Sequence, residues 1–157
     1  MSNTGIFKKY IKPVVIVLLL MWLGIVLSLT VLGREPFEGR HFQPDFLWSY
    51  KYGYRQGSRF VFQMIENVVM YMPFGFLFPF LLKEKLSGWK LFVITIIAGL
   101  AISFTTEFMQ SLFRIGLFEF DGLFHNGLGI VIGFLVQLVF FRAGPSSSGA
   151  GLTVWAL

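Results

Sequence analysis

The residues of this sequence best suited to chemistry are charged and amide side chains that lie inside otherwise apolar runs. Glu66 lies within one such run, Glu107 near the end of the next, and Asp121 at the start of a third. An ionised side chain at the centre of a bilayer costs about 2.5–3.5 kcal/mol on insertion scales, and less near the interface. Such groups therefore face a helix bundle or a water-filled cavity. There they could bind a divalent cation, act as a general base, or form an ion-pair network that fixes helix register.

Each acidic residue has polar neighbours at helical spacing. Glu66 and Asn67 follow Gln63 by three and four positions, and Gln110 follows Glu107 by three. Side chains at these spacings share one face of a helix. We expect a polar pocket at one depth of the membrane, in which Arg114 and also Arg55 or Arg59 meet the carboxylates. Its predicted members are Glu66, Asn67, Glu107, Gln110, Arg114, Asp121 and Asn126, with Gln63 and Tyr71 on the same helical face.

Single members of this set have plainer interpretations. His125 is expected as a hydrogen-bonded helix residue rather than a catalyst, and Asn126 could simply join two helices. The charges as a group could be helix-end residues in the headgroup zone. No catalytic residue is assigned.

Composition places the chain in a membrane. Hydrophobic residues make up 55% of its 157 residues and charged residues 13%, whereas a soluble domain carries roughly 25% charged residues. The 13 Lys and Arg residues are scattered between apolar runs, so no nucleic-acid surface is expected. The sequence has no cysteine and only two histidines, so neither a multi-histidine metal site nor a cofactor is predicted.

Four apolar runs are long enough to span a bilayer as helices. We predict an all-α integral membrane protein with spans at Pro13–Leu32, 60–82, 91–113 and 122–141. The first run could be a signal peptide, but its length and the missing cleavage site favour a retained helix. An aromatic-rich segment, Phe42–Tyr54, is expected at the headgroup level outside the membrane. Residues 1–142 form the predicted membrane domain, and the Gly- and Ser-rich residues 143–157 a flexible tail.

Basic residues predict the orientation. Lys8, Lys9 and Lys12 precede the first span, whereas Arg34 alone follows it closely. Lysine and arginine gather on the cytoplasmic side of membrane proteins. We therefore expect both termini in the cytoplasm and the polar pocket facing outward.

Proline and glycine residues indicate how the spans pack. Pro73 and Gly75 lie inside the second span, with Pro79 beyond them, so that helix should kink or break. A packing kink is preferred to a functional hinge. Gly129 and Gly133 are four positions apart in the fourth span and should allow close helix packing, with homodimerisation as the other interpretation.

In order and spacing, these motifs resemble the VanZ-like family of small bacterial membrane proteins. The resemblance rests on Asn67-x5-Pro73-x-Gly75, Glu107-x2-Gln110, Arg114, Asp121 and Asn126-x2-Gly129-x3-Gly133. It implies a bacterial plasma-membrane protein of the cell envelope that contributes to resistance against lipoglycopeptide antibiotics of the teicoplanin type. It also implies that the polar positions named above are shared with the family, except Glu66, which rests on its spacing alone.

Three functions are compatible with the sequence. The preferred one is a non-enzymatic envelope protein whose pocket binds an amphiphilic ligand: a membrane lipid, a lipoglycopeptide or a lipid-linked envelope precursor. A membrane enzyme acting on a lipid-linked or phosphorylated substrate is the alternative, although no nucleophile or metal motif is present. A transporter is disfavoured because four spans are few and no inverted repeat is visible.

Overall fold

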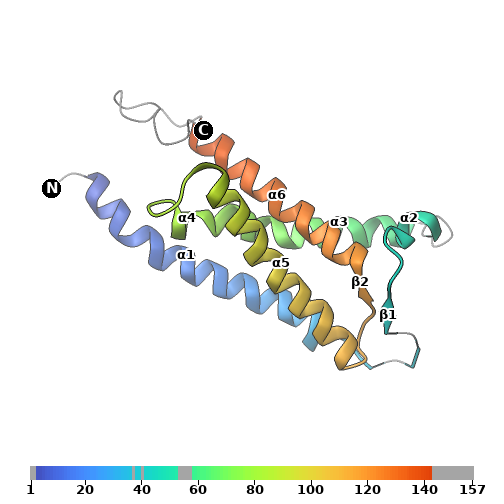
Figure 1. The fold of residues 1–157 in the computed structure, drawn as a ribbon. Coiled ribbons are helices and arrows are strands. Elements are labelled where there is room, and N and C mark those ends of the chain that lie inside the picture. Colours follow the sequence, from blue (N-terminus) through green and yellow to red (C-terminus); the bar gives the residue numbers. More distant parts are fainter. Residues whose placement is uncertain (1–2, 37, 40, 53–57, 143–157) are drawn as a thin grey trace.

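The computed structural model describes residues 3–36, 38–39, 41–52 and 58–142, and four long helices dominate it (Figure 1). Each helix coincides with one apolar run of the sequence. The segments long and apolar enough to cross a membrane are Tyr10–Leu32, Val61–Leu82, Gly88–Leu112 and Phe120–Phe140. The predicted all-α fold with four membrane spans is therefore confirmed. The predicted tail, residues 143–157, lies outside the described residues, as do Arg55 and the side chain of Arg59.

The first helix, α1 (Asn3–Leu27), continues into one π-helical turn, η1 (Ser28–Leu32). A two-residue strand, β1 (Phe42–Gln43), and a short helix, α2 (Trp48–Tyr52), lie in the connection to α3 (Ser58–Leu77). A single turn, α4 (Pro79–Leu82), completes the second span. The rest comprises α5 (Gly88–Leu112), a second short strand, β2 (Phe118–Glu119), and α6 (Phe120–Arg142).

The outer surfaces of the four helices are apolar. Leu20 is 63% exposed, Phe62 63%, Ile97 59% and Val139 67%. Side chains of this kind are stable on a protein surface when hydrocarbon, not water, surrounds them. The chain is a multi-pass membrane protein.

The second span breaks where its second proline lies. Helix α3 runs through Pro73 and ends at Leu77, and Pro79 then occupies the first turn of α4. Pro79 has no backbone N–H and fits the start of a helix better than its interior. The expected break therefore falls at Phe78, while Pro73 stays within α3.

Helices α3 and α6 touch through their backbones along a line of glycines. A Cβ atom at Gly75 would lie 2.0 Å from the Ile130 carbonyl oxygen, and one at Gly133 would lie 2.1 Å from that of Met72. A Cβ at Gly129 would lie 2.2 Å from the Val68 oxygen. No larger residue fits these positions without separating the helices. The glycine spacing in α6 thus serves close packing within one chain.

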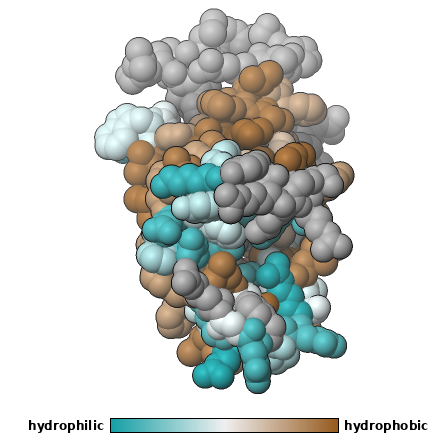
Figure 2. Space-filling model, turned by 90° about the vertical axis from the view of Figure 1, so that its right-hand side faces the viewer, coloured by the Kyte–Doolittle hydropathy of each residue, from teal (hydrophilic) through white to brown (hydrophobic). Residues whose placement is uncertain are grey.

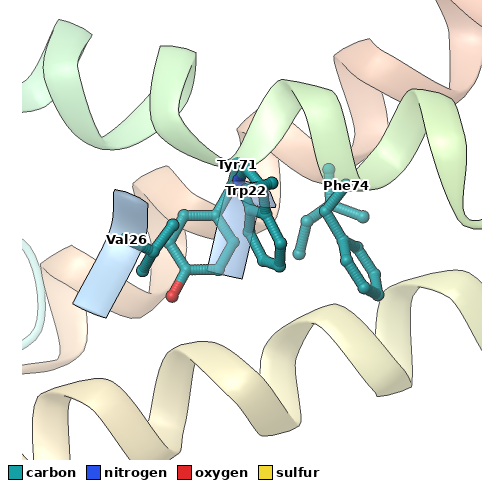
Figure 3. Packing of buried hydrophobic residues seen from close by; sticks show 5 residues of the cluster. Trp22, Val26, Tyr71 and Phe74 are labelled. Atoms are coloured by element: carbon teal, nitrogen blue, oxygen red, sulfur yellow. The ribbon is translucent and has the colours of Figure 1, made fainter. Parts of the chain in front are cut away.

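Helix α1 joins this pair through an aromatic core. Trp22 and Val26 of α1 pack against Tyr71 and Phe74 of α3, with Ile130 of α6 beside them (Figure 3). The Trp22 indole N–H donates to the Met70 carbonyl oxygen at 2.7 Å. The core lies next to the polar residues described below and holds α1 and α3 in place beside them.

The two ends of the bundle differ in content. The start of α1 and the end of α6 lie at one end, whereas β1, β2 and α2 cluster at the other (Figure 1). Figure 2 looks onto this second end, where hydrophilic residues gather over its central and lower parts. This end therefore presents a largely hydrophilic surface.

Candidate ligand-binding cavity

The connection between the first two spans is fastened to the start of α6. Strand β1 pairs in parallel with β2, so that Phe42 lies opposite Phe118 and Gln43 opposite Glu119. The Asp121 carboxylate accepts hydrogen bonds from the backbone N–H groups of Leu47 (2.5 Å) and Ser49 (2.8 Å). The described part of the aromatic segment expected at the headgroup level, residues 42–52, is thus a folded cap on the bundle.

Near the start of α6 lies a cavity of about 250 Å³. Its wall comes from η1 and the residues that follow it, from α3, α5 and α6, and from the loop between the last two helices. The polar side chains around it are Thr30, Arg34, Gln63, Asn67, Tyr71, Thr106, Glu107, Gln110, Glu119 and Asn126. Residues far apart in sequence therefore meet at one depth.

Glu107 is the most enclosed carboxylate of this wall, with 8% of its surface exposed. Its Oε2 accepts a hydrogen bond from the backbone N–H of Glu119 at 3.4 Å. A Cβ atom at Gly122 would lie 2.3 Å from its Oε1. Gly122 therefore makes room for the carboxylate against the first turn of α6.

Glu119 is the second carboxylate of the cavity and lies just before the fourth span. Burial, together with the nearby charge of Asp121, raises the pKa of Glu119 to about 7, although Trp48 and Arg34 oppose the change. Among the described residues the one ion pair within 4 Å is Lys12 with Glu84, at the far end of the bundle. Neither cavity glutamate therefore has a cation at that distance within the described part of the chain.

The basic residue of the cavity wall is Arg34. It follows η1, where the Gly33 N–H donates to the Ser28 carbonyl oxygen at 2.8 Å. π-Helical turns of this kind occur frequently at functional sites. A Cβ at Gly116 would lie 3.3 Å from Arg34 Nη1 and 2.8 Å from Gln110 Oε1, so the guanidinium lies over this glycine.

A buried hydrogen-bond network lines the floor of the cavity. Tyr71 OH lies 3.1 Å from Thr106 Oγ1, and the Thr106 hydroxyl donates to the Ser103 carbonyl oxygen at 2.8 Å. Asn126 Nδ2 donates to Ser103 Oγ at 2.8 Å. Asn126 therefore joins α6 to α5, as the interhelical interpretation expects, and it also borders the cavity.

A second cavity, of about 230 Å³, adjoins the first beneath α2. Gln63, Asn67, Glu119 and Gly122 border both cavities. His125 lines the second one and lies with Nε2 2.8 Å from Tyr50 OH. His125 is thus the hydrogen-bonded helix residue expected from the sequence. Burial and the nearby charge of Asp121 raise the pKa of its partner, Tyr50.

The structure divides the seven predicted pocket residues into two groups. Asn67, Glu107, Gln110 and Asn126 line the first cavity. Asp121 is 1% exposed and lines neither cavity, because both of its oxygens hold the cap. The remaining two, Glu66 and Arg114, are exposed and lie outside both cavities.

The position of Arg114 differs from the expectation of one continuous helical face. Helix α5 ends at Leu112, and Arg114 has a left-handed backbone with φ of 57°. Its side chain therefore leaves the face that carries Glu107 and Gln110. In the structure Arg34 takes the place expected for Arg114, and Glu119 takes that expected for Glu66.

Sequence reasoning missed Arg34 and Glu119 because both lie outside the apolar runs. A usable signal for Glu119 was its place two residues before Asp121, at the same membrane boundary. Within the described residues, no group of three or more histidine, aspartate or glutamate side chains is placed to hold a metal ion.

A comparison with protein families gives one match, the VanZ/LLP1 model, over residues 13–141. No curated protein and no solved structure matches the chain. The matched range includes nearly all of the four spans and every residue that lines the two cavities. The chain therefore belongs to the VanZ/LLP1 family.

Proposed function

We propose that this protein binds an amphiphilic ligand at the outer surface of the bacterial plasma membrane and thereby contributes to resistance against lipoglycopeptide antibiotics of the teicoplanin type. The polar head of the ligand occupies the first cavity and its apolar part lies along the helices in the membrane. Family membership supports a VanZ-like membrane protein. The ligand and the resistance are the proposal.

The observation that carries the proposal is the pair of cavity glutamates. Glu107 and Glu119 face one cavity and have no cation within 4 Å among the described residues. Buried carboxylates without a partner destabilise a fold. A cavity that holds the buried Glu107 and the half-buried Glu119, with no cation within 4 Å among the described residues, is suited to a ligand that supplies a positive charge.

The surroundings of the cavity suit an amphiphile. Gln63 and Arg34 line the cavity and are exposed to the outside. Further along α3, toward the centre of the membrane, Ile65 and Val69 are exposed and apolar. A head group in the cavity would therefore continue into a chain that lies against apolar helix surface.

The orientation is part of the proposal. Lys12, Lys83, Lys85 and Lys90 lie at the end of the bundle opposite the cavity, and this end is assigned to the cytoplasm by the positive-inside rule. The chain has no cysteine, so single-cysteine variants report its topology directly. Externally added maleimide should label Glu38→Cys, which is exposed in the connection after the first span, and leave Lys85→Cys unlabelled. The reverse pattern would contradict the orientation.

Antibiotic susceptibility tests the function. Cells that express Glu107→Gln should lose the teicoplanin tolerance conferred by the wild-type protein. Glu66→Gln is the matched control, because Glu66 is an exposed glutamate in the same membrane half and lies outside both cavities. At equal expression, unchanged tolerance with Glu107→Gln, or equal losses in both variants, would contradict the role of the cavity.

One observation favours a second function, a membrane enzyme acting on a lipid-linked or phosphorylated envelope substrate. The pKa of Glu119 is raised to about 7, which suits a general acid or base, and Arg34 on the same wall could bind a phosphate. Purified protein should then convert such a substrate, and Glu119→Gln should abolish the conversion. Binding without turnover would retire this alternative.

A further inference from the structure

We infer that the polar head accepted by the cavity is a protonated primary amine, held by Glu107, Glu119 and the Asn126 side-chain carbonyl. This inference rests on the amphiphile-binding function proposed above and names the chemistry of the head group. Three features of the wall carry it: the direction of its hydroxyl donors, an unpartnered carbonyl, and an uncompensated charge.

The hydroxyl groups of the wall donate into the protein and not into the cavity. Thr30 donates to the Val26 carbonyl oxygen at 2.6 Å, and Thr106 donates to that of Ser103 at 2.8 Å. Because the Thr106 hydrogen is already engaged, the Tyr71 hydroxyl must be the donor in their 3.1 Å contact. These three hydroxyl donors are therefore unavailable to a ligand, and the donors left on the wall are those of Arg34 and the side-chain amides.

Asn126 adds an acceptor without a partner. The residue is 3% exposed, and its Nδ2 donates to Ser103 Oγ. Its Oδ1 is buried and has no hydrogen-bond partner within the described residues. A buried polar atom left unsatisfied costs about 1–3 kcal/mol. A ligand that donates to this oxygen recovers that energy on binding.

The two glutamates line the same cavity as this carbonyl and add negative charge to it when ionised. They are adjacent, because the Glu119 N–H donates to Glu107 Oε2 at 3.4 Å. The guanidinium of Arg34 is more than 4 Å from both carboxylates, since neither forms an ion pair in the described part of the chain. A primary ammonium group has one positive charge and three N–H donors. Two carboxylates and one carbonyl supply acceptors for the three N–H donors, and the ionised carboxylates together with Arg34 leave one negative charge on the wall to balance the ammonium.

Other head groups fit less well. An anionic head would meet two carboxylates against one arginine, and a quaternary ammonium has the charge but no hydrogen to donate. A zwitterionic head with an amine and a phosphate fits the whole site: the ammonium lies at the glutamates and the phosphate at Arg34. The shared chemistry is the primary amine, whether it comes from a lipid or from a soluble amine.

Calorimetric titration of the purified protein in detergent at pH 8 tests the inference. The probes are dihexanoyl-phosphatidylethanolamine, dihexanoyl-phosphatidylcholine and free ethanolamine. The ethanolamine lipid should bind at least about tenfold more tightly than the choline lipid, as expected for one charge-assisted hydrogen bond. Comparable binding of free ethanolamine would identify a soluble amine as the source, and binding of the lipid alone a membrane lipid.

Variants link the binding to the cavity. Glu107→Gln should weaken binding of the ethanolamine lipid at least about tenfold, whereas Glu66→Gln should bind like the wild type. Thermal unfolding of Glu107→Gln should occur at no lower temperature than that of the wild type, because the substitution removes a buried charge. A loss of binding therefore cannot be attributed to misfolding.

Three results would overturn the inference: equal affinity for the two lipids, unchanged binding by Glu107→Gln, or no binding of any primary amine. If the wild type bound both lipids with equal affinity and Glu107→Gln weakened both, the proposed function would still stand, because an amphiphile would still occupy the cavity. Failure of the susceptibility experiment would instead remove the function itself. The two failures are therefore distinguishable.

Discussion

Helices α3 and α6 meet in two regions that follow opposite rules, the glycine contact and the first cavity. Along the contact, Gly75, Gly129 and Gly133 bring backbone against backbone, and a single added methyl group would have no space. One or two turns away, Asn67 and Asn126 on the same helices face open volume. One region is completely filled, whereas the other keeps polar atoms without partners.

This difference separates stability from function within one small bundle. Close packing supplies much of the attraction between helices in a membrane, where burial from water contributes little. A binding site needs unsatisfied groups, and such groups reduce stability. The glycine contact is thus able to stabilise a cavity that would not hold itself together.

The largest expected effect comes from filling the glycine contact. Gly75→Ala places a methyl group about 2 Å from the Ile130 carbonyl oxygen and must push α3 away from α6. We expect a loss of about 3 kcal/mol or more, the upper end for overpacking, measured as a lower unfolding temperature in detergent. Gly24→Ala is the control, because no atom lies within 4 Å of its added Cβ. Equal effects of the two substitutions would contradict the comparison.

An intermediate effect is expected at the cap. Asp121→Ala leaves the backbone N–H groups of Leu47 and Ser49 without their acceptor, at about 1–3 kcal/mol for each unsatisfied group. The helices should remain folded while residues 41–52 exchange their amide hydrogens faster. Hydrogen-exchange mass spectrometry measures this. Uniformly faster exchange in all four spans would show that Asp121 stabilises the bundle and not only the cap.

The fold was predictable because each span is encoded by its own apolar run. The sequence also predicted the shared depth of Asn67, Glu107, Gln110 and Asn126, because helical periodicity and span direction determine which residues reach one end. These rules are local and need no knowledge of how the helices pack.

The rest of the site depends on contacts that periodicity does not contain. Arg34 reaches the cavity through a π-helical turn, and Glu119 through a strand pair with β1. From the sequence alone, Asp121 cannot be told apart from a carboxylate that binds a ligand. Its structural role is visible only in its hydrogen bonds from the Leu47 and Ser49 N–H groups, which are far away in the sequence. Glu66 lies one position from Asn67 and yet faces away from the cavity.

The smallest expected effect is the dependence of stability on pH through Glu119. Burial raises the pKa of Glu119 from 4.5 to about 7, so between these pH values the folded protein keeps a proton that the unfolded chain releases. A shift of this size corresponds to about 3 kcal/mol for a fully buried group. Because Glu119 is only half-buried, the free energy of unfolding should fall by roughly 1–2 kcal/mol as the pH rises through this window and stay level above it. Unfolding temperatures measured from pH 4.5 to 8 test this. Glu119→Gln should reduce the slope. Equal slopes for the wild type and Glu119→Gln would mean that Glu119 is as solvated in the folded protein as in the unfolded chain. Glu119 would then not destabilise the cavity, and the contrast with the glycine contact would be weaker.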